Sequence, residues 1–403
     1  MPGSTPPLAR RPDDPEGSTL KTPPATRWDV VCRVVDNLGD AAVMWRLARQ
    51  LAVEHGRCVR LFIDQPEVLK RLVPAASIGA RVEGVAIHEL ADDRDRSCRQ
   101  ENEACDADVV VAGFHAELPE SYRCGMAARP PVWINLEYLS AEDWIERFHG
   151  LPSPQADGLT QYFFYPGFTL GSGGLLRESD LMARRDAFRR HDGAVRFFAD
   201  LGVRRLSGET TASILCYPHA PLDELARQLC DSAVRLHLVV PQGAVAGLTG
   251  AADTAALGRA SHGRLRITPI PFLAQRDYDQ LLWSCDLNFV RGEDSLVRAI
   301  WSGNPFVWQI YPQAGAAHLP KLEAFLRLLP GVPLADATRW WNHVPGVDDS
   351  AMLELLSHPQ RASNCLQLLA PLSTAADLST RLTAFVHTVA ASRPKGTDTA
   401  GKL

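Results

Sequence analysis

Residues 30–52 read VVCRVVDNLGDAAVMWRLARQLA, and this stretch indicates the fold class. It opens with Val30–Val35, an apolar run of strand length that is interrupted by Arg33. The polar turn 36–40 follows, and after it apolar side chains repeat at helical spacing, with Arg46 and Arg49 on the other side. A buried strand, a short turn and an amphipathic helix form the unit from which parallel sheets covered by helices are built.

The same unit recurs in both halves of the chain. The strand-length runs are Val59–Ile63, Val82–Ile87, Val109–Ala112 and Val132–Leu136, then Ile214–Tyr217, Leu236–Val240, Leu265–Thr268, Leu287–Val290 and Phe306–Ile310, and helical patterns in the second group are Leu222–Leu229, Gln275–Trp283 and Ser295–Trp301. Residues 177–200 are charged and helix-like without a strand. Because 403 residues exceed one ordinary core, we predict an α/β protein of two Rossmann-like domains that face each other across a cleft.

We place the N-terminal domain at 27–190 and the C-terminal domain at 191–363. A last periodic segment, about 364–391, is predicted to return to the N-terminal domain as a closing helix. Residues 1–26 and 392–403 are rich in small and polar side chains and are predicted to be disordered tails. The first of these tails lacks the apolar core of a signal peptide.

The composition narrows the class of protein. The 42 basic and 47 acidic side chains give a net charge of −5, the wrong sign for binding nucleic acid through a broad basic face. The nine cysteines form no Cys-x-x-Cys pair, so the sequence supports neither a zinc ribbon nor a dithiol site, and a reducing cytoplasm fits best. We also expect no membrane span, because no run approaches eighteen apolar residues.

The turn Asp36–Asp40 allows two interpretations. In the first it is a simple connection, in which Asn37 and Gly39 accept positive φ and Asp40 caps the helix that begins at Ala41. In the second the carboxyl end of the strand projects one or both carboxylates into a cleft. Both hold together if a capping carboxylate keeps one oxygen free.

A second polar turn, Arg291–Ser295, holds the same position between a strand and a helix in the second half. A helix N-terminus presents free N–H groups and binds phosphate, and Arg291 adds further donors. Glu293 and Asp294 would repel a diphosphate, so they are either ordinary first-turn acids or acceptors of hydrogen bonds from sugar or base. A dehydrogenase fits poorly, because no Gly-x-Gly-x-x-Gly turn follows the first strand.

Neighbouring segments end at the same edge of the predicted second sheet. Phe272 is placed to stack on a base and Gln275 to bond to it, although a phenylalanine in this position is more often a core residue. Tyr311 directly follows the predicted strand Phe306–Ile310. His318 and Lys321 are possible phosphate contacts or part of a solvated helix face.

Taken together, these segments resemble the EarP family, protein-arginine rhamnosyltransferases that modify elongation factor P. The resemblance is carried by Val34–Asp40 with Trp45–Leu51, by Tyr162–Phe168, and by Pro269–Gln275, Tyr278–Trp283, Phe289–Ser295 and Tyr311–Gln313. It spans about residues 28–390. It implies a GT-B glycosyltransferase, which holds dTDP-β-L-rhamnose mainly in the C-terminal domain and transfers the sugar with inversion to an arginine of elongation factor P. No metal or other cofactor is expected.

The resemblance also assigns roles to single residues. Asp40 takes the position of the catalytic base, Asp36 that of a second essential aspartate and Glu293 that of an essential glutamate. The donor-binding positions are Phe272, Gln275, Arg291, Asp294, Ser295 and Tyr311, with Tyr217 as a further contact. The family's aromatic residue two positions before Tyr217 is replaced by Leu215 in this chain.

Two alternatives remain open at this point. One is a GT-B enzyme that uses another nucleotide sugar on a small molecule or glycan. The other is a non-catalytic binding module, in which Asp36 and Asp40 are turn residues alone.

Overall fold

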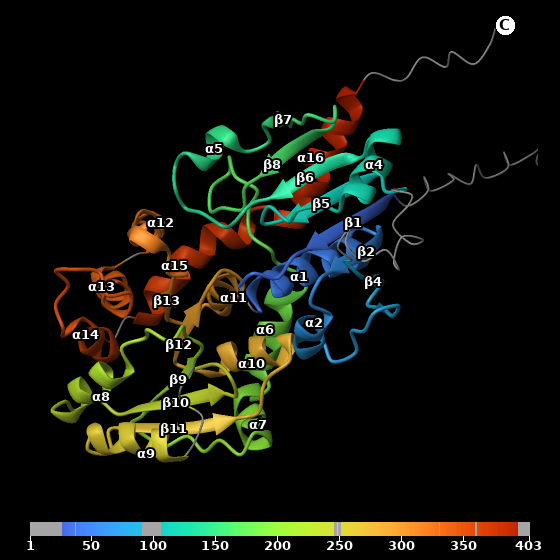
Figure 1. Cartoon of the computed structure of the whole chain (residues 1–403). Helices are drawn as coiled ribbons and strands as arrows, with labels where there is room; N and C mark the ends of the chain where they lie inside the picture. The colour runs from blue at the N-terminus through green and yellow to red at the C-terminus, as the bar shows by residue number, and fades with distance from the viewer. Residues whose placement is uncertain are drawn as a thin grey trace, which may run out of the picture.

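The computed structural model describes residues 26–393 apart from 37, 91–105, 246–247, 249–250, 330 and 359–360. Figure 1 shows two α/β halves, each built on its own sheet. The predicted tails lie largely outside the described residues, although helix α16 continues to Ser392.

The first sheet has eight strands in the spatial order β3-β4-β2-β1-β5-β6-β8-β7. Their bounds are β1 Arg27–Cys32, β2 Cys58–Ile63, β3 Arg81–Val82, β4 Val85–Glu89, β5 Val109–Gly113, β6 Val132–Leu136, β7 Pro152–Pro154 and β8 Thr160–Phe164. The central strands pair in parallel, and the outer strands β3 and β7 pair antiparallel to their neighbours. Parallel central strands are buried on both faces, which explains why all five residues of β5 and of β6 are buried.

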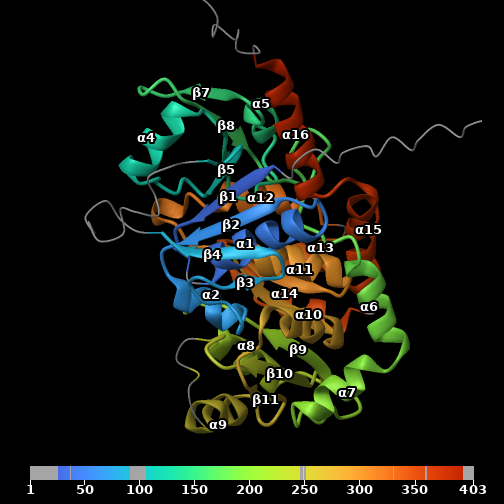
Figure 2. The same ribbon diagram turned by 90° about the vertical axis from the view of Figure 1, so that its right-hand side faces the viewer.

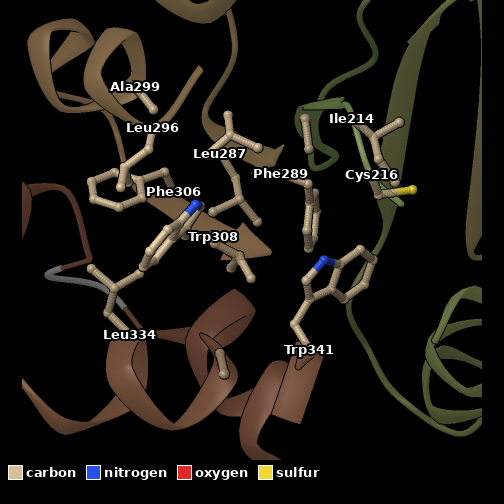
Figure 3. Close-up of a cluster of buried hydrophobic side chains, with 14 of the residues drawn as sticks. Ile214, Cys216, Leu287, Phe289, Leu296, Ala299, Phe306, Trp308, Leu334 and Trp341 are labelled. Atoms are coloured by element: carbon tan, nitrogen blue, oxygen red, sulfur yellow. The ribbon is translucent and has the colours of Figure 1, made fainter. Parts of the chain in front are cut away.

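The second sheet has five parallel strands in the order β11-β10-β9-β12-β13. Their bounds are β9 Thr210–Ile214, β10 Leu236–Pro241, β11 Leu265–Ile270, β12 Leu287–Arg291 and β13 Phe306–Gln309. Figure 3 shows part of the core on this sheet, where Phe289 of β12 meets Trp341. The two ring centroids are 4.5 Å apart and both side chains are fully buried. Each such side chain contributes about 1.5–3 kcal/mol or more by leaving water.

The helices fill the connections between strands. In the first half they are α1 Gly39–Val53, α2 Pro66–Leu72, α4 Glu120–Ala128 and α5 Ile145–Phe148. Two helices, α6 Leu181–Arg190 and α7 Gly193–Asp200, link the halves. The second half has α8 Leu222–Cys230, α9 Ala251–Ala260, α10 Gln275–Ser284, α11 Asp294–Ser302, α12 Leu319–Leu326, α13 Val332–Trp341 and α14 Ala351–Ser357. Figure 2 shows α1 and α11 side by side between the two sheets, and they are in contact. No helix among the described residues has the length and apolar character needed to cross a membrane.

The segment predicted as one closing helix over 364–391 is two helices, α15 Arg361–Thr374 and α16 Leu378–Ser392. The side chain of Asp377 caps α16 by accepting hydrogen bonds from the N–H groups of Ser379 and Thr380. Helix α15 contacts α11 of the second half, whereas α16 packs against α1 and β6 of the first. The helix that packs against the first half is therefore α16, which begins at Leu378, later than the predicted closing helix.

Three predicted strands differ from the structure. The run Val30–Val35 leaves the sheet after Cys32, because carboxylates of Asp64 and Asp40 take the N–H groups of Val34 and Val35. The prediction Val82–Ile87 was wrong as one strand: residues 83 and 84 have φ of 46° and 85° and form a tight turn between β3 and β4.

The third, Ile214–Tyr217, was placed too late in the sequence, since β9 ends at Ile214. The N–H of Cys216 donates to the carbonyl of Ala244 at 3.0 Å, and that of Tyr217 to Oε1 of Gln309 at 2.6 Å. The backbone thus leaves the ladder and carries Tyr217 past the end of the sheet.

Each sheet has a position where the direction of strand order reverses. In the first sheet it lies between β1 and β5, and in the second between β9 and β12. Open α/β sheets bind ligands outside the carboxyl ends of the strands at such a position. The turn 36–40 follows β1, and the turn 291–295 begins at the end of β12. The topology therefore brings both predicted turns to binding positions.

Candidate active site

The Asp36–Asp40 turn holds the carboxylate of Asp40 inside the protein. Helix α1 begins at Gly39, whose N–H donates to the carbonyl of Asp36 at 2.8 Å. Oδ2 of Asp40 accepts the N–H groups of Val35 and Asp36 at 2.8 and 2.9 Å, and the residue is 3% exposed. Among the described residues no side chain caps the start of α1. The capping interpretation is therefore wrong, and Asp40 braces the turn instead.

The surroundings of Asp40 make it a stronger base than an ordinary aspartate. Burial raises the pKa of its carboxyl, and the nearby charge of Asp36 raises it further, although the two backbone N–H bonds oppose the shift. Among the described residues, no hydrogen bond is formed by Oδ1 of Asp40. That oxygen belongs to a side chain that lines a cavity.

Asp36 links the two halves of the molecule. Its Oδ2 accepts the phenol O–H of Tyr217 at 2.8 Å. The guanidinium of Arg291 lies 4.8 Å from the centroid of the Tyr217 ring, and its Nη1 donates to the carbonyl of Cys216 at 2.9 Å. A cation over an aromatic face is attracted by the ring quadrupole. A carboxylate of the first half is thus joined through one tyrosine to a cation of the second.

The turn 291–295 approaches Asp36 closely through a glycine. Gly292 has φ of +62°, and a Cβ at this position would lie 3.2 Å from both Oδ2 of Asp36 and the Tyr217 hydroxyl. The hydroxyl of Ser295 donates to the carbonyl of Arg291 and accepts its N–H, the latter at 3.1 Å. The Ser295 hydroxyl therefore fixes the turn.

Glu293 reaches across the interface. Its Oε2 accepts the N–H of Leu139 in the first half at 2.7 Å, and its Oε1 accepts from Nζ of Lys321 at 2.9 Å. Burial raises the pKa of Glu293, and the charge of Lys321 opposes that shift. The interpretation of Lys321 as part of a solvated face is wrong, because its side chain is 25% exposed and ion-paired. His318 lies on the same wall, where its Nδ1 accepts the N–H of Gln313.

Two cavities adjoin at these turns. The first cavity is lined by residues of both halves, including Asp36, Leu215, Phe272, Gln275, Arg291, Glu293, Asp294 and Ser295. The second cavity is lined by Asp36, Asp40, Phe114, Tyr138, Glu293, Tyr311 and Lys321, among others. Asp36, Gly39, Gly292 and Glu293 line both. The structure thus brings together all ten residues singled out from the sequence. Tyr217 lies between Asp36 and Tyr311, and the centroids of the two tyrosine rings are 5.4 Å apart.

Phe272 and Gln275 sit where β11 leads into α10. Phe272 is partly buried against the apolar core of the first half. The guanidinium of Arg71 lies 4.7 Å from the centroid of the Phe272 ring. Nε2 of Gln275 donates to the carbonyl of Ala42 in α1 at 3.0 Å. Both residues therefore bridge the halves and line the first cavity at once.

A buried ion cluster behind the first cavity was missed in the sequence. Arg46 and Arg298 face Glu178, Asp279 and Asp294, and none of the five side chains is more than 11% exposed. Arg46 donates to Asp294 at 2.9 Å, and Arg298 to Asp279 at 2.6 Å. Burial raises the pKa of Glu178, but the two arginines outweigh burial and lower it overall.

The cluster changes how two predictions are understood. Arg46 was expected on the side of its helix away from the apolar stripe, yet it is buried at the interface between the halves. Asp294 was expected to bind the donor. Its Oδ1 accepts a hydrogen bond from Arg46, and the residue also lines the first cavity, so donor binding by Asp294 stays a prediction. An arginine in a helix carries no sequence signal for a carboxylate more than two hundred residues away.

Among the described residues, no group of three or more His, Cys, Asp or Glu side chains is arranged to hold a metal ion. The charged groups that line the cavities are the carboxylates of Asp36 and Asp40 in the first half, and in the second half the carboxylates of Glu293 and Asp294 with the cations Arg291 and Lys321.

Solved structures with low sequence identity share this architecture. A spinosyn rhamnosyltransferase complexed with thymidine diphosphate is 13% identical with a TM-score of 0.50, over 91% of this chain and 100% of that one. A UDP-GlcNAc 2-epimerase from Neisseria meningitidis is 10% identical with a TM-score of 0.51, over 91% and 100% of the chains. The predicted GT-B fold with two Rossmann-like domains is thereby confirmed.

More similar proteins share the sequence as well. A protein-arginine rhamnosyltransferase of Pseudomonas aeruginosa is 48% identical over 335 residues, which cover 78% of this chain and 86% of the relative. One of Shewanella oneidensis is 34% identical over 90% of this chain and 98% of its own length. A solved structure that describes EarP-mediated arginine glycosylation of translation elongation factor EF-P aligns at 29% identity with a TM-score of 0.58, over 91% and 99% of the chains.

A family model also matches the chain. It is described as the elongation-factor P (EF-P) rhamnosyltransferase EarP, and the match runs over residues 28–387. These residues include both sheets and both turns of the candidate site. The predicted resemblance is therefore confirmed, and the chain belongs to the EarP family.

Proposed function

We propose that this chain transfers L-rhamnose from dTDP-β-L-rhamnose to an arginine side chain of elongation factor P, with inversion at the anomeric carbon. One observation carries the proposal: the turn with Asp36 and Asp40 faces the turn with Arg291, and two cavities meet between them. The relatives named protein-arginine rhamnosyltransferase support rhamnose as the sugar and arginine as the acceptor side chain, and the family description supports elongation factor P as the acceptor protein. Because the proposed acceptor serves translation, we propose that the reaction takes place in the cytoplasm.

The donor is proposed to occupy the first cavity. Phe272 stacks on the thymine and Gln275 lies beside it, since both line this cavity. Arg291 and the free N–H groups at the start of α11 stabilise the charge that grows on the leaving diphosphate. These groups supply what a metal ion supplies in other transferases, so we propose a metal-independent transfer. A chelator should then leave the rate unchanged.

The acceptor is proposed to enter the second cavity, where Asp36, Asp40 and Glu293 grip the guanidinium. A guanidinium has a pKa above about 12, so a carboxylate cannot remove its proton before the reaction. As the N–C1 bond forms and the C1–O bond to the diphosphate breaks, the nitrogen becomes acidic and its proton passes to Asp40. The raised pKa of Asp40 favours this transfer.

Intact mass spectrometry of elongation factor P tests the proposal. Incubation with the chain and dTDP-β-L-rhamnose should add the mass of one deoxyhexose, and the anomeric coupling in the NMR spectrum of the product should report the α configuration. UDP-glucose in place of the donor should add nothing. If the acceptor mass stays constant although dTDP raises the melting temperature of the chain, the chain uses another sugar or acceptor.

A further inference from the structure

Two aromatic residues follow the carboxyl ends of strands β5 and β6. Phe114 directly follows β5, and Tyr138 lies two residues beyond the end of β6. The rings stack with their centroids 4.6 Å apart and their planes 17° from parallel. Phe114 is 8% exposed and Tyr138 is 38% exposed. Both line the second cavity, so Phe114 supports a Tyr138 ring that remains accessible.

The turn that holds Phe114 is strained and specifically supported. Phe114 and His115 have φ of 55° and 58°, a conformation that residues other than glycine rarely adopt. The N–H of Phe114 donates to the carbonyl of Leu136 at 2.7 Å, and that of His115 to Oδ1 of Asn135 at 3.1 Å. Glu137 binds both Asn135 and His115, at 2.6 and 2.9 Å. Such backbone conformations concentrate at ligand sites, where the surroundings hold them.

Carboxylates surround the space beside the Tyr138 ring. Asp36, Asp40 and Glu293 share the cavity wall with it. Burial raises the pKa of the Tyr138 phenol, and the negative charges of Asp40 and Glu293 raise it further. Nζ of Lys321 already lies 5.6 Å from the Tyr138 ring centroid while it pairs with Glu293. A positive group therefore fits between the ring and the carboxylates.

We infer that the Tyr138 ring, backed by Phe114, is the shelf on which the guanidinium of the acceptor arginine stacks during transfer. The inference rests on the proposed function, because it names how the acceptor side of that site recognises arginine. The N–H groups of a stacked guanidinium point outward in a plane parallel to the ring. They are therefore free to reach Asp36 and Asp40. Tyr138 is then a specificity-determining residue for the acceptor.

The shelf selects arginine over lysine. A guanidinium is planar and weakly hydrated, so it stacks on an aromatic ring, whereas an ammonium is a compact and strongly hydrated charge. Nζ of Lys321 lies over the Tyr138 ring and occupies part of this space. The incoming guanidinium competes with Lys321 for Glu293 and for the ring, so removing the Lys321 charge should tighten arginine binding.

Binding of small acceptor analogues tests the shelf without requiring turnover. N-acetyl-arginine amide and N-acetyl-lysine amide are titrated by NMR into the full chain saturated with dTDP. The original chain should prefer the arginine compound. Tyr138→Leu should weaken arginine binding by about 2- to 30-fold, the range expected of a cation–π contact, and Tyr138→Phe should restore it. Lys321→Met should bind the arginine compound more tightly than the original chain.

The affinity for dTDP, measured for each variant, shows whether the variant is folded and its first cavity intact. Equal arginine binding by Tyr138→Leu and the original chain would overturn the inference. Equal binding of the arginine and lysine compounds by the original chain would overturn it as well. Rhamnose transfer to elongation factor P is measured in parallel. Arginine binding that depends on Tyr138, without any transfer, would contradict the proposed function and leave the shelf standing.

Discussion

Replacing Arg46 by methionine should destabilise the interface between the halves more than any change at the surface of α1. Arg46 is 4% exposed and donates to Asp294, Asp279 and Glu178 at 2.9, 3.1 and 3.3 Å. The cluster holds three carboxylates and two guanidinium groups. Without Arg46 the cluster keeps three carboxylates and one guanidinium, that of Arg298, so its charge changes from −1 to −2.

The expected magnitude follows from burial. Removing one partner of a buried ion pair costs about 3–5 kcal/mol, because the other charge stays buried without compensation. For a half of about 150–250 residues, each kcal/mol lowers the melting temperature by roughly 2–4 °C, so the shift should be about 6 °C or more. Loss of the Arg46–Asp294 contact also loosens the wall of the first cavity. The affinity for dTDP should therefore fall as well.

Arg49→Met is the matched control, one turn further along the same helix. Arg49 pairs with Glu83 at the surface and reaches Glu178 only at 3.9 Å. Exposed pairs contribute about 0–1 kcal/mol, so this variant should melt close to the original chain. Differential scanning calorimetry, with and without dTDP, compares the two variants. If Arg46→Met melts within the range of Arg49→Met and binds dTDP normally, the ion cluster does not hold the halves together.

Three further predictions concern the cavities. Phe272→Ala should weaken dTDP binding by about 1–3 kcal/mol, the range for loss of base stacking on an aromatic ring, and a titration calorimetry result equal to the original chain would remove the base from this cavity. Gly292→Ala should reduce rhamnose transfer sharply, because φ is +62° and the added Cβ would lie 3.2 Å from oxygen atoms of Asp36 and Tyr217. Normal turnover of this variant would show that the turns separate during the reaction. The transfer rate should fall as the pH drops through a pKa higher than that of an ordinary aspartate, because the base must be ionised and burial raises the pKa of Asp40. If the rate instead falls only around the ordinary aspartate pKa, the base is another residue.

Sequence patterns predicted most of the framework for a physical reason. Buried parallel strands are continuous apolar runs, so Val132–Leu136 is a strand with the bounds predicted for it, and four of the five runs of the second half lie within a residue or two of strands β10 to β13. Bounds failed where side chains compete for backbone groups. Asp40 takes the N–H of Val35, and Gln309 takes that of Tyr217, so both segments leave their sheets early.

The candidate site was predictable in part. Strand–turn–helix units place polar turns at the carboxyl ends of strands, which suffices to find Asp36 and Arg291. This pattern does not reveal that the Asp40 carboxylate accepts hydrogen bonds from its own turn, or that the Glu293 carboxylate reaches Leu139 in the other half. Tyr138 follows a buried strand in the same manner, and that position was the available signal for the shelf. The ion cluster depends on how the two halves dock, which no local pattern records.

The role of Asp40 is tested most directly by comparing Asp40→Asn with the original chain in rhamnose transfer and in dTDP binding. The side-chain carbonyl of asparagine accepts the N–H groups of Val35 and Asp36 as the carboxylate does, so the turn should survive. We predict a loss of about 10²–10⁴-fold or more in turnover, as for removal of a general base, with dTDP affinity and melting temperature unchanged. Near-normal turnover, or a large loss of dTDP affinity, would contradict Asp40 as the base.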